Sequence, residues 1–201
     1  MLFGFRDKDT PLLYTVHNGD FEGCKLLLDK GADCCIRNRA NVTVTWTAAY
    51  CNHPDLLRYL VVHGNPPLSV PSRGLVFEHD GRYPPFIYHV EHTPLYVALY
   101  RKNFAIAETL LDAGVMMSEE HWYWSEDMNC DLSEQSSLRC RLTAAASEVP
   151  SLLHITRHQL RRRLGQQILT IIPDLEIPET LKDYLALRSL ESRTLTHNVD
   201  G

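Results

Sequence analysis

Apolar residues in the first part of the chain recur in three copies of one pattern, each typical of two short helices joined by a turn. Every copy starts at a threonine and ends at a glycine 21 positions later. The Leu-rich second half of a copy forms an apolar face that one copy cannot cover by itself, so we expect the copies to stack. The copies run from Thr10 to Gly31, from Thr43 to Gly64 and from Thr93 to Gly114.

A second helical pattern follows Pro150, near the C-terminus. Its apolar positions recur on one side of a helix, which we expect to end near Gly165. A stripe of this kind either packs on its own domain or presents its apolar face to a groove on another protein. The stripe consists of Leu152, Ile155, Thr156, Leu160 and Leu164.

The repeated pattern resembles the ankyrin repeat. The first copy has the Thr-Pro-Leu start and the Leu-Leu-x-x-Gly-Ala end of that family, with Leu13 in place of histidine and Thr15 in place of alanine. The resemblance implies an all-α solenoid of about three ankyrin repeats, with an irregular helical bundle as the alternative. Ankyrin stacks generally bind through hairpin tips and inner helices, which makes Arg37, Arg39 and Trp46 candidate target-binding residues.

The spacing between the copies is broken once. The third copy starts 29 positions after the second one ends, against 12 between the first two, which is an insertion of 17 residues. The inserted segment is rich in proline and aromatic residues, and Asp80-Gly81 could form the turn of a hairpin arm. Tyr83, Phe86 and Tyr88 are candidate target-binding residues because large aromatic side chains are typical of interface cores. A tolerated surface insertion is the alternative.

The C-terminal segment resembles a SOCS box, a module that recruits Elongin B and Elongin C and then a cullin. In that family a leucine is followed four positions later by cysteine and eight positions later by an aliphatic residue. The resemblance implies that Elongin C is bound by Leu152, Ile155, Thr156 and Leu160. A second family element combines aliphatic residues and prolines and contacts the cullin. Its matching positions here are Ile172, Leu175, Ile177 and Pro178.

Two positions depart from the SOCS box pattern. Thr156 stands where the family has cysteine, and a hydroxyl without a partner in an apolar pocket costs roughly 1–3 kcal/mol. Because a helical threonine can donate its hydroxyl proton to the carbonyl four residues earlier, here that of Leu152, we expect weakened rather than lost binding of Elongin C. Glu176 replaces the first proline of the second element, which weakens the match to the pattern that favours Cullin-5.

These assignments divide the chain into an ankyrin-repeat domain, a SOCS box and a flexible tail. We place the three parts at 1–149, 150–188 and 189–201. Within the first part the repeats lie at about 9–41, 42–92 and 93–117, with the insertion at 66–92. Residues 118–149 are expected to cap the last repeat, and a helix is expected from Asp131 to Ala146.

Composition narrows the functions further. The 201 residues are 44% hydrophobic and 22% charged, as in ordinary globular proteins, and the net charge of −5 argues against nucleic-acid binding. The basic run Arg161-Arg162-Arg163 is expected to face solvent. No apolar stretch is long enough to span a membrane, and the N-terminus is too quickly charged for a signal peptide. We therefore expect an intracellular, cytoplasmic protein, with the nucleus left open.

Ankyrin-type repeats followed by a SOCS-like box resemble the ankyrin repeat and SOCS box family. That resemblance implies a non-catalytic substrate receptor, which brings a target protein to Elongin B/C, Cullin-5 and its RING protein. A plain ankyrin scaffold is the first alternative, and an enzyme that combines Cys51 with His79, His89 or His92 is the second. Six cysteines without a C-x-x-C pair and ten scattered histidines predict no metal site, and we expect no cofactor.

Overall fold

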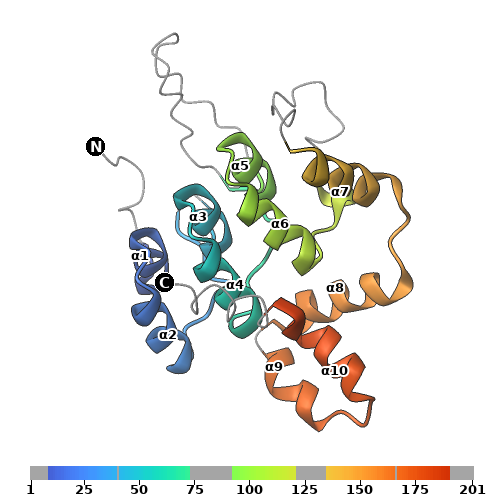
Figure 1. Cartoon of the computed structure of the whole chain (residues 1–201). Helices are drawn as coiled ribbons and strands as arrows, with labels where there is room; N and C mark the ends of the chain where they lie inside the picture. Colours follow the sequence, from blue (N-terminus) through green and yellow to red (C-terminus); the bar gives the residue numbers. More distant parts are fainter. Residues whose placement is uncertain (1–8, 40, 73–91, 121–134, 166, 191–201) are drawn as a thin grey trace, which may run out of the picture.

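The computed structural model describes residues 9–39, 41–72, 92–120, 135–165 and 167–190 (Figure 1). These residues are mainly helical. Among them, extended pairing is limited to an isolated antiparallel bridge between Ser72 and His92, where the inserted segment leaves and rejoins the repeats. The predicted all-α class is confirmed.

Three helix pairs form the first part of the structure. They are α1 (Pro11–Asn18) with α2 (Phe21–Asp29), α3 (Val44–Cys51) with α4 (Pro54–His63), and α5 (Pro94–Tyr100) with α6 (Phe104–Ala113). The first helices of the pairs pack on one another, α1 on α3 and α3 on α5, and the second helices form a neighbouring row (Figure 1). The predicted stacking of the three copies is therefore confirmed.

The recurring threonines cap the first helix of each pair. The hydroxyl oxygens of Thr10, Thr43 and Thr93 accept from the backbone N–H three residues later, at 3.2, 3.1 and 3.3 Å. Each bond satisfies one of the N–H groups that the first turn of a helix leaves without a partner. Proline occupies the first turn of α1 and α5, where its missing N–H is harmless.

The main core runs through all three pairs. Ala48 and Ala98 are fully buried between the first helices, as expected of small residues that allow close helix packing. Trp46 is only 1% exposed and stacks on Tyr50, with 5.1 Å between ring centroids. The Trp46 side chain thus belongs to the core in this structure, and its contact with a target stays a prediction.

Two further elements, η1 (Met117–Glu119) and α7 (Ser136–Ser147), cover the third repeat. Leu138 and Leu142 of α7 are buried in the main core. The first residues of the helix expected from Asp131 lie outside the described part of the chain.

The C-terminal helices form a compact unit beside α4 (Figure 1). This unit contains α8 (Leu152–Leu164), α9 (Gln167–Ile171), η3 (Ile172–Asp174) and α10 (Glu179–Ala186). Ile168, Ile172 and Leu185 are buried in a small core of its own. Beyond α10, Leu187 and Leu190 are buried in the main core, so the unit and the repeats share apolar surface.

Candidate protein-interaction site

The N-terminal end of α8 presents an apolar surface to solvent. Ser151 caps the helix, its hydroxyl oxygen accepting from the N–H of His154 at 3.2 Å. Directly after this cap, Leu152 is 80% exposed and Leu153 is 47% exposed, and the preceding Val149 is 90% exposed. A leucine held on the first turn of a capped helix, without apolar cover from its own chain, can enter a pocket on another protein.

The rest of the predicted Elongin C stripe lies partly on the surface. The Thr156 hydroxyl donates to the carbonyl oxygen of Leu152 at 2.7 Å, which confirms the expected satisfaction of this group within its own helix. Thr156 is exposed and Ile155 is half-buried. Leu160 is half-buried against the small core of the C-terminal unit. The stripe therefore begins as an open surface and ends as internal packing, and Gly165 follows it with a positive φ of 53°.

The predicted cullin-binding element also has a buried part and an exposed part. Ile172 is 2% exposed and Ile177 packs beside it, so both hold the small core together. The Ile172 side chain is covered by its own chain and has a structural role here, and its contact with a cullin stays a prediction. Leu175 is 37% exposed, and Pro178 and Glu176 are also exposed. These three residues form the accessible part of the element.

Arg161 joins the C-terminal unit to the second repeat. Its guanidinium donates to the carbonyl oxygen of Leu185 at 2.9 Å and to that of Val61 at 2.7 Å. These carbonyls lie in the last turns of α10 and α4, where helices have oxygens without intrahelical partners and a negative dipole end. The expectation that Arg161 faces solvent is wrong: the residue is 8% exposed.

Asn65 completes this connection from the repeat side. Its side-chain amide donates to the carbonyl oxygens of Arg161 and Gly165, at 3.0 and 2.6 Å, which lie at the end of α8. Arg161 thus caps a repeat helix while Asn65 caps a helix of the C-terminal unit. We call Arg161 and Asn65 the clasp. Because four hydrogen bonds cross or border the junction, the two parts are held in one orientation.

A second group of contacts lies one turn earlier on α8. The Arg157 guanidinium lies over the ring of Tyr184, 4.2 Å from its centroid. Gly114, at the end of α6, has a φ of +89°, and an added Cβ there would meet Arg157 and His154. Burial, together with the nearby charge of Arg157, lowers the pKa of His154. Glycine is needed here because it adopts this conformation and leaves room for α8.

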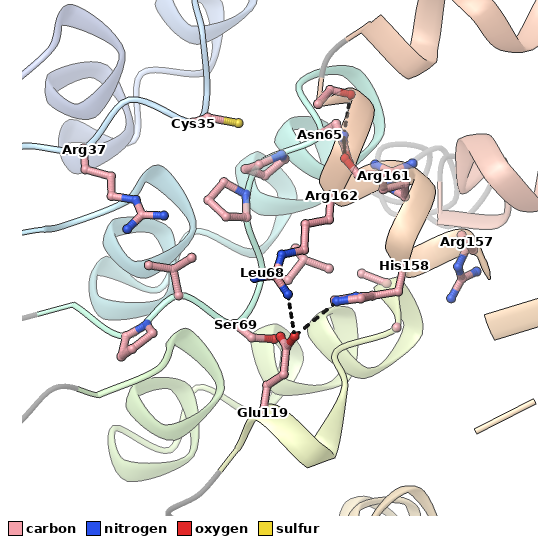
Figure 2. A pocket seen from close by; sticks show the side chains of 17 residues that line it. Cys35, Arg37, Asn65, Leu68, Ser69, Glu119, Arg157, His158, Arg161 and Arg162 are labelled. Carbon is pink, nitrogen blue, oxygen red and sulfur yellow. Dashed lines mark hydrogen bonds and ion pairs between the residues drawn. The ribbon is translucent and has the colours of Figure 1, made fainter. Parts of the chain in front are cut away.

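A cavity of about 590 Å³ opens between the repeat tips and α8 (Figure 2). One wall is the turn from Asn65 to Pro71, which follows α4, and the opposite wall is α8. Glu119 of η1 lies between them, 3.3 Å from both His158 Nε2 and Arg162 Nη1. The interaction with the His158 ring is the main cause that lowers the pKa of Glu119, so this carboxylate is ionised at neutral pH.

Comparison with known families agrees with this architecture. The family model described as "Ankyrin repeats (3 copies)" matches residues 12–121, and the one described as "SOCS box" matches residues 148–186. The chain belongs to the ankyrin repeat and SOCS box family. A search of curated proteins found no match. In this family arrangement, repeats that bind proteins precede a box that generally binds Elongin B/C and a cullin, which supports a substrate-adaptor role in a cullin-RING ligase.

The predicted target-binding residues of this ankyrin repeat and SOCS box chain are only partly placed by the structure. Arg37 is exposed on the tip after the first repeat, where it donates to Asn41 Oδ1 at 3.0 Å, and it reaches the cavity. Arg39 is exposed nearby. Tyr83, Phe86 and Tyr88, with the predicted hairpin arm, lie outside the described residues.

The enzyme alternative finds little support in the same structure. Cys51 Sγ lies 3.3 Å from His17 Nδ1, and burial raises the pKa of Cys51 to about 11, which keeps it a thiol rather than a nucleophilic thiolate. His92 stacks on the ring of Tyr96, with 4.2 Å between centroids. Ankyrin repeats and SOCS boxes are non-catalytic interaction modules. His79 and His89 lie outside the described residues.

Two searches of the described residues gave negative results. No group of three or more His, Cys, Asp and Glu side chains is placed to hold a metal ion in this part of the chain. Within the same ranges, the helices are too short or too polar to cross a bilayer.

Sequence reasoning missed Asn65, Arg157 and Arg161. Arg157 and Arg161 are four residues apart and each follows a stripe position, so a wider buried face on α8 could have been inferred from that spacing. Asn65 gave no such signal, because its two acceptors lie 96 and 100 residues away in the sequence.

Proposed function

We propose that this protein is the substrate receptor of an Elongin B/C–Cullin-5 ubiquitin ligase. In this proposal the SOCS box docks on the ligase while the ankyrin repeats hold a target protein. The receptor makes no bond itself; it raises the effective concentration of the target near the ubiquitin-loaded enzyme. The observation that carries the proposal is the 80% exposure of Leu152 at the family position for Elongin C.

That exposure separates the proposal from its main rival. A plain scaffold, in which α8 only caps the repeats, predicts that Leu152 and Leu160 are both covered by their own chain. Leu160 is half-buried in the small core, but Leu152 is open to solvent beside exposed Leu153 and Val149. Such a surface is stabilised when a partner removes it from water, by about 25 cal/mol per Å² of apolar area.

The choice of Cullin-5 rests on the second element of the box. Leu175 and Pro178 are exposed at the family positions, on either side of the half-buried Ile177. Glu176 is exposed between them, where the family has a proline. An exposed carboxylate must be partly desolvated when a cullin approaches, so we expect Cullin-5 to bind with reduced affinity.

Target binding is assigned to the repeat tips and the inserted segment. Arg37 and Arg39 are exposed on the tip that precedes α3. Tyr83, Phe86 and Tyr88 of the insertion are retained in the proposal on their composition alone, because large aromatic side chains contribute contact area with few rotatable bonds. Replacing the three with serine, followed by proximity labelling, should change the set of ubiquitinated neighbours.

The decisive experiment measures capture of purified Elongin B/C by the full chain. Replacing Leu152 with alanine should weaken binding by about 2–4 kcal/mol, the scale of an interface hot spot, or roughly thirtyfold to several hundredfold. Leu26→Ala is the matched control, because it removes the same atoms from an exposed leucine on α2, outside the SOCS box. It should leave affinity within about threefold of the wild-type value.

Circular dichroism of both variants shows whether the repeats stay folded. If wild-type chain captures no Elongin C, the scaffold alternative replaces the receptor. Equal losses for Leu152→Ala and Leu26→Ala would contradict the assignment of Leu152 as the anchor. A competition between Cullin-5 and Cullin-2 for the Elongin-bound chain then tests the cullin choice, and exclusive recovery of Cullin-2 would overturn it.

A further inference from the structure

The cavity between the repeat tips and α8 differs from the rest of the molecule in its charge. Its charged lining residues are four arginines and one glutamate, a formal charge of +3, whereas the whole chain carries −5. The arginines are Arg37, Arg157, Arg161 and Arg162, and the glutamate is Glu119. A concave site lined by one sign of charge focuses the electrostatic field and attracts the opposite charge.

Two of these arginines are held by contacts with their own chain. Arg161 donates to two backbone carbonyls and Arg157 lies over the Tyr184 ring. Neither forms an ion pair with a carboxylate among the residues that the structure describes. Their buried positive charges are thus uncompensated by neighbouring acids, and the positive potential extends into the cavity.

The other two arginines can exchange their partners. The Arg162 side chain is 68% exposed, and its contact with Glu119, at 3.3 Å, is an exposed ion pair of the kind that contributes little. Glu119 retains His158 when Arg162 leaves. Arg37 is exposed and donates to a neutral side-chain oxygen, that of Asn41. A carboxylate is a stronger acceptor than that amide, so an incoming acid can recruit both guanidinium groups.

The remaining wall suits a polypeptide better than a small ion. Pro66, Pro67, Leu68 and Pro71 form an apolar, rigid face, and the volume of about 590 Å³ accommodates several side chains. Figure 2 shows Leu68 of this face and, from α8, the Arg162 and His158 side chains that reach Glu119. The clasp keeps the two walls together, so the site is formed before a ligand arrives.

We propose that this cavity binds an acidic segment of the target protein, with carboxylates received by Arg37 and Arg162 and apolar side chains packed on Pro67, Leu68 and Pro71. This inference rests on the proposed receptor function and adds the chemistry of the target. A segment bound here contacts the repeats and the SOCS box at once. The ligase-binding module itself therefore takes part in choosing the target.

The first test is a capture experiment with immobilised full-length chain. The probe is an equimolar library of short peptides of random neutral sequence, half of them carrying two glutamates and half carrying glutamines at the same positions. Wild-type chain should enrich the acidic half. Arg37→Gln and Arg162→Gln should each reduce that enrichment by about threefold to tenfold, as expected for losing one partly exposed charge-assisted hydrogen bond.

Arg163→Gln is the matched control, because Arg163 is exposed on the same helix but does not line the cavity. It should keep the wild-type enrichment. Equal enrichment in all four chains, or none in any, overturns the proposal. An oligo(dT) probe that binds with the same dependence on Arg37 and Arg162 would assign the site to nucleic acid and also overturn it.

The second test locates the bound peptides. Cys35 is exposed and lines the cavity, whereas Cys140 is exposed on α7, outside it. The captured acidic peptides should slow alkylation of Cys35 by iodoacetamide relative to Cys140, with both rates read by mass spectrometry in the same molecules. An unchanged ratio places the peptides elsewhere and overturns the site.

Capture of Elongin B/C by the same chains is measured separately. Because neither Arg37 nor Arg162 belongs to the proposed Elongin C stripe, both variants should bind Elongin B/C like wild type. Elongin capture without acidic enrichment overturns the cavity proposal alone. Acidic enrichment without Elongin capture supports the cavity and overturns the receptor function.

Discussion

Replacing Arg161 with methionine tests whether the clasp holds the SOCS box against the repeats. Methionine is shorter than arginine but keeps an unbranched apolar stem, and it removes every donor. The carbonyl oxygens of Val61 and Leu185, at 2.7 and 2.9 Å from the guanidinium, then lose that donor inside a buried junction. The substitution therefore acts on the junction and leaves the helices themselves intact.

The magnitude follows from two opposing contributions. Each hydrogen bond to a charged group stabilises by about 1.5–3 kcal/mol, so two of them contribute about 3–6 kcal/mol. Burial, reinforced by the nearby Arg157, lowers the pKa of Arg161 to about 10, which corresponds to a cost on the order of 3 kcal/mol for keeping this charge in the folded state. The difference between the two contributions is about 0–3 kcal/mol, and near its middle Arg161→Met should lower the free energy of unfolding by about 1–2 kcal/mol.

Urea unfolding followed by circular dichroism and by tryptophan fluorescence measures this change. Arg163→Met is the control, because Arg163 is exposed on the same helix and should shift stability by less than about 0.5 kcal/mol. Asn65→Ala should couple with Arg161→Met, since Asn65 donates to the Arg161 carbonyl. A variant as stable as wild type, or more stable, would refute the reasoning and show that apolar packing alone fixes the junction.

Three further outcomes are expected. Thr156→Cys should tighten Elongin C binding by up to about tenfold, because the hydroxyl that now bonds to Leu152 is not ideal in an apolar pocket. The bulky Thr156→Phe should abolish binding. Equal affinities of the three chains in calorimetry would place Thr156 outside the interface. Glu176→Pro should strengthen Cullin-5 capture by the Elongin-bound chain, since an exposed carboxylate is removed and the element is stiffened; unchanged binding in interferometry would contradict this. The lowered pKa of His154 means that the folded chain takes up a proton less readily than the unfolded chain, so stability is fully present above pH 6.5 and falls as the pH drops through that value. His154→Gln should reduce the loss of stability between pH 7.5 and 5.5, measured by urea titrations. Part of the loss should remain, because the pKa of His92 is also lowered. A steeper loss of stability in the variant would contradict the lowered pKa assigned to His154.

Features that depend on near neighbours in the chain were predictable. The threonine caps, the bond from Thr156 to Leu152 and the helix end at Gly165 each involve residues within four positions of one another. Their geometry is fixed once a helix forms, so the residue types and their spacing are sufficient. The three-copy repeat was predictable for the same reason, because each copy repeats these local signals.

The burial of individual side chains was not predictable in the same way. Trp46 and Ile172 occupy positions that a family pattern or a helix face suggests for partners, yet both are covered by the chain's own packing. Leu152 and Leu160 belong to one stripe, but the first is open and the second half-covered. Helical periodicity gives the face on which a residue lies, whereas its cover depends on which element packs there.

The sequence by itself determined the helices, their caps, the repeated unit and the C-terminal stripe, because these follow from interactions within a few residues. Only the tertiary structure decided that Arg161 and Asn65 fasten the box to the repeats, and that Arg37 and Arg162 border the same cavity. In the sequence, nothing distinguishes Arg161 from the exposed Arg162 and Arg163 of the same basic run. Its hydrogen-bond acceptor in the repeats lies 100 residues away, so its role exists only once the two modules have packed together.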